Sequence, residues 1–525
     1  MKKILSILGL LLFYILFSVV VMEAGVRLFD KARPAADPDF FWQTGDPVTG
    51  WKMIPNASGR WFNNWFEYDT TISVNERSLR APADLTYEKP EGVFRVIVLG
   101  DSFVEAAQVE LAESFPQQLG DLLRQQGLNA QVINAGVGGW GNDQKLIWLR
   151  EEGYKYKPDL VVLAVFPRND FMNNYQPLEA ANMRSNNKPY FRLENGQLKA
   201  ELFPFDPATA PPVENLVEIP QPEAIPEGPL IGVRNWLWAH SALYRYIDPR
   251  IRVTAPYFAI WLDRIGLLKA GEETEVLVKH QLPVPMAYNV YHNPPTAEWQ
   301  SAIDLTGAIF AEVKRLSTEM GAKSAGLVVT APEQVMPEYW QALHYQYPQM
   351  QSVDWSLDFP SDKTVELFNK IGMPVLNPLA LFRQRYADGD NLHFYVDGHW
   401  TAQGHRLVAR QLFNFLAAQQ LLPQLEGVQI PETTGVTRGI VRDVVLWVVL
   451  LALLGSLLWS VYKNGLGKWL RTAGSGATTA GELLAYIVRQ RQFFLLPVVL
   501  VLLLFGALLV IAQASVVGPF IYTLF

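Results

Sequence analysis

The sequence predicts an α/β protein: a three-layer α/β/α sandwich with a parallel sheet, a large insertion and three transmembrane helices. In the middle of the chain, short apolar β-branched runs alternate with helical patterns. A proline-rich and aromatic stretch interrupts this alternation, and long uncharged runs lie near both ends. Strands that are apolar at nearly every position suit a parallel sheet covered by helices on both faces.

The composition excludes several classes of protein. A chain of 525 residues with 50% hydrophobic and 18% charged residues is long enough for two to four folded domains and too apolar for disorder. It contains no cysteine, which excludes disulfides, thiolate metal sites and a cysteine nucleophile. The net charge of -7 argues against nucleic acid as a partner.

The N-terminus predicts a membrane anchor over residues 1–26. The run from Ile4 to Met22 is 19 residues long and carries no charge, enough to cross about 30 Å of hydrocarbon. Lys2 and Lys3 precede it. A signal peptide is the alternative, but the run exceeds the usual apolar core of such peptides, and Glu23 interrupts the small residues that follow.

The C-terminal region predicts a transmembrane hairpin over residues 444–525, after a linker over 426–443. Its two uncharged runs are Val444 to Tyr462 and Phe493 to the terminus. The connection between them carries one acid, Glu482, and five basic residues: Lys463, Lys468, Arg471, Arg489 and Arg491. The positive-inside rule therefore places this connection and the N-terminus in the cytoplasm, and the C-terminus and central region outside. A buried helical hairpin is the alternative.

The central region over 91–425 begins with a β-α-β-α-β pattern. A strand is predicted over residues 94–99 and a helix over 115–123, with Gly127 as its stop. A strand follows from Gln131, and then come a helix around 144–154 and a strand over 159–166. In such a sheet, functional sites lie at the carboxyl ends of the strands.

An insertion over about 173–295 separates this pattern from its continuation. Prolines crowd residues 203–229, and an aromatic stretch covers 236–262. This stretch suits a lid, an interfacial membrane segment or an ordinary packed subdomain.

Residues 27–90, before the α/β region, are expected to form an extracytoplasmic lead-in segment.

The α/β pattern resumes after the insertion. Thr296 is the expected N-cap of a long helix, and Gly321 is its expected stop. A strand ending at Val329 then adds to the same sheet, and a last helix begins near Ala402.

Candidate catalytic residues follow the predicted strands. Ser102 lies on the turn after strand 94–99, but a serine nucleophile needs a base and a group that orients the base. Among the histidines, His399 has the best context, with Asp397 two residues before it. We therefore expect Asp397 to hold one imidazole nitrogen, while the other takes the proton of Ser102.

Acyl chemistry also needs donors for an oxyanion. Gly138 and Gly139 follow the strand from Gln131, where backbone N–H groups can approach a substrate closely. Asn169 follows the strand over 159–166 and offers a side-chain amide.

These motifs together resemble the SGNH, or GDSL-type, hydrolases. The four blocks of that family match here in order, over about Glu91–Met172 and Thr296–Leu422: GDSF from Gly100, NAGVGG, the ND of PRND, and DGHW from Asp397. The resemblance implies a triad of Ser102, His399 and Asp397. It also implies an oxyanion hole formed by the N–H groups of Ser102 and Gly139 and the amide of Asn169.

Two departures from the family pattern narrow the expectation. Pro167 stands where the third block usually has glycine, and the last block is Asp-x-His instead of the commoner Asp-x-x-His. The Asp-x-His-Trp form resembles SGNH-like proteins of exopolysaccharide O-acetylation.

Separately, the C-terminal segment resembles a small bacterial membrane-protein family of unknown function that ends in PFIYTLF.

The expected function is a serine esterase or O-acyltransferase in the bacterial inner membrane, with its catalytic domain in the periplasm or outside the cell. Its expected substrates are acyl esters, above all acetyl esters, of envelope or exported saccharides. A membrane acyltransferase or polysaccharide-synthesis complex is a candidate partner. The alternatives are a non-catalytic glycan-binding or assembly protein and a lipid esterase. No cofactor or metal is implied, and local structural roles are expected for Asp101 and His405.

Overall fold

The computed structural model describes the chain over 19–20, 22–28, 40–63, 67–181, 188–200, 228–254, 256–268, 285–346, 350, 354–425 and 427–431. These residues all belong to the first of two compact units, Met1–Thr433 and Thr434–Phe525. The predicted linker and C-terminal hairpin lie almost entirely outside the described residues, so their prediction stays untested.

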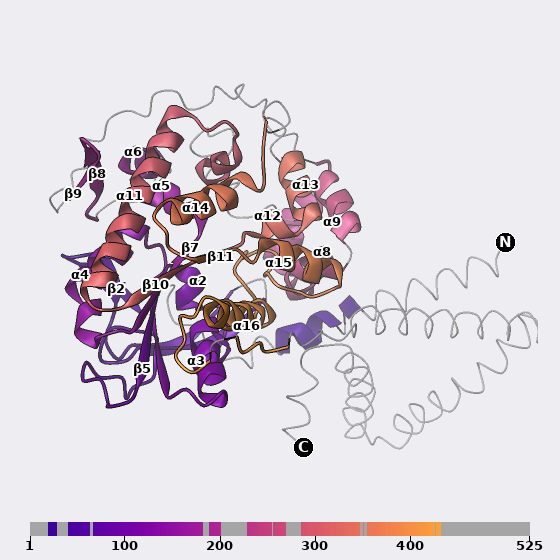
Figure 1. Cartoon of the computed structure of the whole chain (residues 1–525). Coiled ribbons are helices and arrows are strands. Elements are labelled where there is room, and N and C mark those ends of the chain that lie inside the picture. The colour runs from indigo at the N-terminus through magenta and orange to yellow at the C-terminus, as the bar shows by residue number, and fades with distance from the viewer. Residues whose placement is uncertain are drawn as a thin grey trace, which may run out of the picture. The chain divides into compact units, whose positions relative to one another are not determined.

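A five-stranded parallel sheet forms the centre of the first unit (Figure 1). Its spatial order is β11-β10-β7-β5-β6, which in chain order is the doubly wound arrangement 2-1-3-4-5. The strands are β5 (Phe94–Gly100), β6 (Ala130–Gly136), β7 (Leu160–Val165), β10 (Lys323–Val328) and β11 (Val375–Leu376). Every residue of β7 is buried. The predicted α/β class and parallel sheet are therefore confirmed.

Helices cover both faces of the sheet. On one face, α3 (Phe115–Gln125) packs against α16 (Ala402–Ala418) over a core that includes Val96 and Val98. On the other face, α4 (Asn142–Glu151) packs against α11 (Ala297–Glu319). The core of that face includes Ile97 and Leu99. Successive residues of one strand thus enter opposite cores, as the pleat of a strand requires.

The predicted helix limits are mostly confirmed. The hydroxyl of Thr296 accepts a hydrogen bond from the N–H of Trp299 at the start of α11, and Gly321 takes a left-handed conformation just after its end. The helix predicted around 144–154 is shorter, because α4 ends at Glu151 and a 3-10 helix, Gly153–Tyr156, follows it. The remaining elements of the α/β region are α2 (Ser102–Glu105), a 3-10 helix (Leu111–Glu113), α5 (Pro167–Asn174), α12 (Pro332–Val335), α13 (Pro337–Gln346), α14 (Phe359–Lys370) and α15 (Leu379–Ala387).

The lead-in segment folds as two antiparallel hairpins. They are β1 (Gln43–Asp46) with β2 (Gly50–Met53), and β3 (Ser58–Phe62) with β4 (Asp69–Ser73). Trp42, Met53 and Ile72 of this segment are buried in the core that lies over Ile97 and Leu99. The lead-in segment is therefore an integral part of the α/β unit.

The insertion contains further regular structure. Its elements are α6 (Gln176–Ala181), the hairpin of β8 (Phe191–Glu194) and β9 (Gln197–Ala200), α7 (Ile231–His240), α8 (Ala242–Thr254), α9 (Pro256–Arg264) and a 3-10 helix (Met286–Tyr291). We call α7–α9 the helical insertion.

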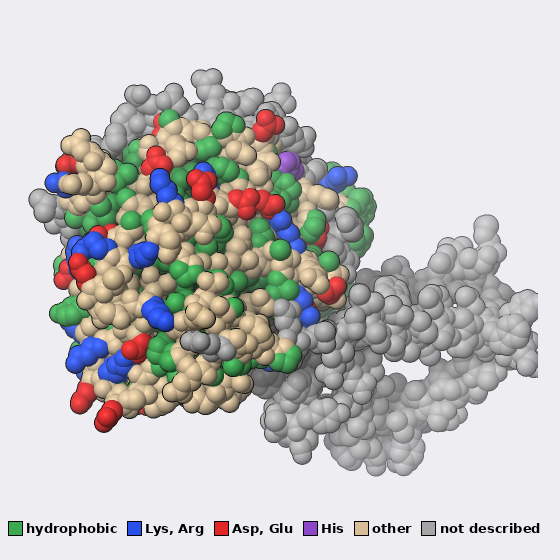
Figure 2. All heavy atoms as spheres, viewed as in Figure 1, with side chains coloured by type: hydrophobic (Ala, Val, Ile, Leu, Met, Phe, Trp, Pro, Cys, Tyr) green, Lys and Arg blue, Asp and Glu red, His purple; other side chains and the backbone are tan. Residues whose placement is uncertain are grey.

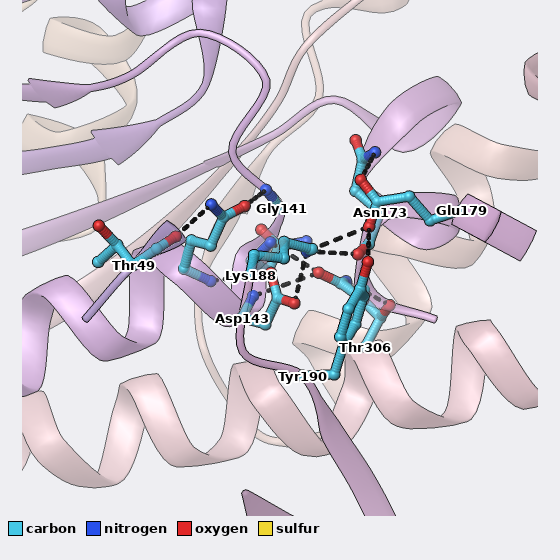
Figure 3. Close-up of polar contacts among 11 residues, drawn as sticks. Thr49, Gly141, Asp143, Asn173, Glu179, Lys188, Tyr190 and Thr306 are labelled. Atoms are coloured by element: carbon cyan, nitrogen blue, oxygen red, sulfur yellow. Dashed lines mark hydrogen bonds and ion pairs between the residues drawn. The ribbon is translucent and has the colours of Figure 1, made fainter. Parts of the chain in front are cut away.

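A buried ionic network fixes the start of the insertion to the α/β unit (Figure 3). The Lys188 ammonium lies 2.6 Å from Asp143 Oδ2, at the start of α4, and donates to the Asn173 carbonyl of α5. Glu179 of α6 accepts from the hydroxyl of Tyr190 and lies 3.4 Å from the same ammonium. Since a buried charge is tolerated only when it is paired, this network specifies where α6 and β8 attach.

Within the described part of the chain, no helix is both long and apolar enough to cross a membrane. Nearly all of Ile4 to Met22 lies outside that part, as do both C-terminal runs. The three predicted spans remain predictions.

Candidate active site

Ser102 lies two residues after the carboxyl end of β5, an inner strand of the sheet. Asp101 caps the short helix α2, and its Oδ1 accepts a hydrogen bond from the Phe103 N–H at 2.9 Å, the local role expected for it. Gly100 and Gly136 let this turn pack tightly on the sheet: a Cβ at Gly100 would meet Val104 at 2.0 Å, and one at Gly136 would meet the Glu105 backbone at 2.3 Å. The sequence therefore places the serine at a crowded, well-defined turn.

The structure brings the three residues of the expected triad together. The Ser102 Oγ lies 2.7 Å from His399 Nε2, and Asp397 Oδ1 lies 2.6 Å from His399 Nδ1. The side chains of His399 and Asp397 are 22% and 15% exposed, so the group of three can be approached from solvent. With a proton on Nδ1 donated to Asp397, Nε2 is free to accept the proton of Ser102.

The electrostatics of the site match these roles. Burial opposes the charged form of His399, but the Asp397 carboxylate outweighs it and raises the pKa of His399 above its ordinary value. Burial raises the pKa of Asp397, and His399 with three hydrogen bonds outweighs that effect, so the pKa of Asp397 is lowered. Asp397 is therefore an anion at neutral pH, and His399 is a base of enhanced strength.

A tight turn allows Asp397 and His399 to act from positions only two residues apart. Phe394 donates its N–H to the His399 carbonyl at 2.8 Å, and Gly398 donates its N–H to the Phe394 carbonyl at 3.0 Å. Gly398 has a φ of +85°, a conformation that glycine adopts readily. Trp400, which follows, is buried and donates its indole N–H to Thr330 Oγ1 at 3.0 Å. The Asp-x-His spacing is thus a property of this turn.

The expected oxyanion donors come from the strands on either side of β5. Gly100 pairs in register with Gly136 of β6, and Leu99 pairs with Leu163 of β7. Gly139 lies three residues beyond Gly136, and Asn169 lies in the first turn of α5 just after β7. The sheet therefore brings Gly139 and Asn169 to the carboxyl ends of the strands, where Ser102 also lies. This place is next to the point where the strand order reverses.

Glu105 holds the glycine loop and was not expected from the sequence. This buried carboxylate accepts hydrogen bonds from the N–H of Gly138 and from the Trp42 indole N–H. Burial raises its pKa. The Trp51 indole N–H donates to the Gly138 carbonyl at 2.9 Å. The lead-in segment therefore supplies two tryptophans that fix the loop carrying the Gly139 N–H.

A buried ion pair holds the start of α5. The Lys145 ammonium lies 2.7 Å from Asp170 Oδ2, and both side chains are fully buried. The same carboxylate oxygen accepts from the Phe166 N–H at 2.9 Å, while Lys145 also donates to the Ala164 carbonyl at 3.1 Å. These bonds connect the end of β7 to the turn that carries Asn169.

Glu67 and Tyr68 of the lead-in segment hold the triad carboxylate. The Tyr68 hydroxyl donates to Asp397 Oδ2 at 3.1 Å. Glu67 accepts from the backbone N–H groups of Val396 and Asp397, at 2.9 and 3.0 Å. Burial, and next to it the negative charge of Asp397, raise the pKa of Glu67 to about 7. No motif marks these residues, because their partners lie about 330 positions away.

Arg80 supports the backbone that follows Ser102, which we call the nucleophile turn. It is fully buried and donates to the backbone carbonyls of Glu105, Ala106 and Val109 at 3.0, 2.5 and 2.7 Å. Burial lowers its pKa to about 10, so the guanidinium stays charged at neutral pH.

Two other histidines, His405 and His393, have structural roles. The Phe115 N–H, at the start of α3, donates to Nδ1 of His405 at 3.3 Å, which is a local structural role of the kind expected for this residue. His393 Nε2 lies 3.2 Å from the Thr330 hydroxyl. Burial lowers the pKa of each to about 3, so both are neutral.

Comparison with known proteins gives limited similarity. Residues 477–525 match a family of unknown function (DUF5989), in agreement with the resemblance of the C-terminal segment. No curated protein sequence matches the chain.

Several solved structures of ester hydrolases match the chain at low identity. The acetyl xylan esterase AlAXEase is 10% identical, with 61% of this chain and 98% of that chain covered, at a TM-score of 0.28. A lipase/acylhydrolase from Enterococcus faecalis is 13% identical, covering 63% and 98%, at 0.28. A catalytic mutant of Axe2, an acetylxylan esterase from Geobacillus stearothermophilus, is 10% identical, covering 62% and 94%, at 0.29.

Proposed function

We propose that this chain is a membrane-tethered serine enzyme that cleaves or transfers acyl esters of envelope or exported saccharides outside the cytoplasm. The hydrogen-bonded chain from Ser102 through His399 to Asp397 carries the proposal. A serine whose hydroxyl meets an imidazole, itself held by a carboxylate, is the arrangement that activates an alcohol as a nucleophile.

The proposed reaction passes through an acyl-enzyme. Ser102 Oγ attacks the ester carbonyl carbon as its proton moves to His399 Nε2, and backbone donors near Gly139 stabilise the oxyanion. The tetrahedral intermediate collapses, the bond to the sugar oxygen breaks, and His399 returns the proton to that oxygen. Water or a second sugar hydroxyl then attacks the acyl-enzyme, with His399 as base, and Ser102 is regenerated.

The choice of substrate rests on two features. The segment from Asp397 to Trp400 resembles that of exopolysaccharide O-acetylation proteins. The uncharged runs at both ends of the chain favour a membrane location next to exported glycans. A short acyl group, acetyl above all, is the proposed cargo.

The test is a serine substitution in the full chain, purified in detergent. Ser102→Ala should abolish labelling by a fluorophosphonate and lower the hydrolysis of a short-chain aryl ester by at least about a thousandfold. Ser301→Ala is the matched control: its exposed hydroxyl only donates to the Ala297 carbonyl within α11, so labelling and turnover should match wild type. Undiminished turnover in Ser102→Ala would overturn the mechanism.

The fate of the acyl group needs a cellular readout. The mass of envelope polysaccharide from cells that carry wild type or Ser102→Ala separates the reactions. An acetyl-sized gain in the variant indicates an esterase, and a loss indicates transfer. A protein that is never labelled at Ser102 but copurifies with a membrane acyltransferase would support the assembly role instead.

A further inference from the structure

The helical insertion exposes apolar side chains to an unusual degree. In α7, most residues are apolar, yet none is buried. Large apolar side chains of α7–α9 that are at least 40% exposed are Val233 (48%), Trp236 (60%), Ile247 (40%), Phe258 (49%) and Trp261 (51%). We call these five residues the apolar edge. Figure 2 shows hydrophobic side chains gathered at the rim where α9 lies in Figure 1.

This exposure is not explained by disorder within the helical insertion. Phe258 and Trp261 stack on each other in α9, with ring centroids 5.6 Å apart. Trp236 stacks on His240 in the same manner within α7. The α9 helix also packs against α13 of the α/β unit. The aromatic rings are thus held in place while they face outward, which marks an interaction surface.

The helical residues 22–28, which begin at the last residue of the run Ile4–Met22, contact the same insertion. The Glu23 carboxylate accepts from the Ser241 hydroxyl at 2.7 Å and from the N–H groups of Ala242 and Leu243 at 3.0 and 2.9 Å. These N–H groups are free donors at the first turn of α8, and the carboxylate caps them. Arg27 donates to the His240 carbonyl and to Glu23. The end of the apolar run is therefore joined to the corner between α7 and α8.

This attachment keeps Trp236 close to the residues at which the apolar run ends. Trp236 lies five residues before Ser241, about 7.5 Å along a helix at 1.5 Å per residue. The interfacial layer that amphipathic segments enter is roughly 5 to 10 Å deep. Tryptophan, with an apolar ring and one N–H, is the residue favoured at that depth.

We propose that the apolar edge of α7–α9 lies in the headgroup region of the same bilayer that the N-terminal run crosses, and that lipid is its occupant. This inference rests on the membrane tether of the proposed function. With two attachments, the tether and the edge, the catalytic unit is held at a fixed height and tilt above the membrane. Ser102 would therefore meet glycans close to the surface.

The cysteine-free sequence allows a direct test in the full chain. Single substitutions Trp236→Cys and Trp261→Cys are labelled with an environment-sensitive nitrobenzoxadiazole probe and reconstituted in vesicles of phosphatidylethanolamine and phosphatidylglycerol. The matched control is Tyr154→Cys, because Tyr154 is 50% exposed and lies between α4 and β7. Nitroxides on the acyl chains should quench the probes at 236 and 261 at least twofold more than the probe at 154, and aqueous iodide should show the reverse order.

Each other outcome would overturn the lipid assignment. Equal quenching at 236, 261 and 154 would mean that the edge faces water. Probes at 236 and 261 that are protected from iodide but not quenched by lipid nitroxides would mean that a second copy of the chain covers the edge. Fluorophosphonate labelling of each variant checks its fold. If the fluorophosphonate does not label the wild-type chain either, the proposed chemistry fails, but the quenching still reports the depth of the probes.

Discussion

The lead-in segment and the helical insertion are both additions to the parallel sheet and its covering helices, and they direct their side chains in opposite ways. The lead-in segment directs Glu67, Tyr68 and Arg80 inward, where each contacts the triad turn or the nucleophile turn. The helical insertion directs Trp236 and Trp261 outward. The lead-in segment buries polar groups, which need hydrogen-bond partners there. The helical insertion exposes apolar groups to solvent.

This difference indicates what each region does. A buried polar or charged group costs several kcal/mol unless it is bonded, so Arg80 and Glu67 are tolerated because they bond to the backbone around Ser102 and Asp397. Exposed rings gain nothing in water, so those of the helical insertion are explained by a partner outside the unit. We therefore expect lead-in variants to impair stability and catalysis, and variants in the helical insertion to spare both.

The largest effect is expected for Arg80→Ala. It removes the guanidinium that donates to three buried carbonyls, those of Glu105, Ala106 and Val109. Of these, the Ala106 carbonyl keeps a second donor, the Val109 N–H. The loss should be about 3 to 5 kcal/mol of the free energy of unfolding, seen as a melting temperature lower by roughly 5 to 10 °C. Tryptophan fluorescence of the full chain in detergent would measure it.

The matched control for this prediction is Arg234→Ala in α7. Arg234 is only partly buried, and it donates to the adjacent Asn235 side chain. Its removal should leave the melting temperature within 1 to 2 °C of wild type, as expected of surface substitutions. Equal losses in the two variants would contradict the contrast between the regions.

The core of the site was predictable because its signals are local. Ser102 follows an apolar strand, and Asp397 and His399 share one turn, so strand ends and spacing identify them. The groups that support them were not predictable. Arg80 and Glu67 bond to backbone atoms, which every residue carries, and Glu67 does so about 330 positions away. The helices of the insertion were also missed individually, because α7 buries none of its residues and so lacks the one-sided apolar pattern that predicts a helix.

Glu67→Gln should change how stability depends on pH. The pKa of Glu67 is about 7 in the folded chain and about 4.3 when unfolded. Between these values the folded state keeps a proton that the unfolded state has lost, so this stabilising contribution is full below about pH 4.3 and is lost as pH rises past 7. The melting temperature should therefore fall less steeply from pH 5 to 8 in Glu67→Gln than in wild type.

Glu194→Gln serves as the control for this measurement, because Glu194 is an exposed carboxylate in β8. It should reproduce the wild-type slope. An unchanged slope in Glu67→Gln would show that Glu67 does not titrate in this window, and would contradict the raised pKa that burial and the charge of Asp397 give it.

The smallest effect is expected for Tyr68→Phe, which removes only the hydroxyl that donates to Asp397 Oδ2. Loss of about 1 kcal/mol should lower kcat/KM for a soluble ester by roughly 3- to 10-fold, with the melting temperature little changed. A carboxylate with one fewer donor is more basic and stabilises protonated His399 further. The acid limb of the pH profile should therefore move to higher pH, so the loss is greater at pH 6 than at pH 9. Tyr244→Phe is the matched control, since it loses a hydroxyl bonded to the Leu267 carbonyl within the helical insertion and should keep the wild-type profile. A uniform loss at every pH in Tyr68→Phe would limit Tyr68 to packing, because only a change in the basicity of Asp397 can displace the limb.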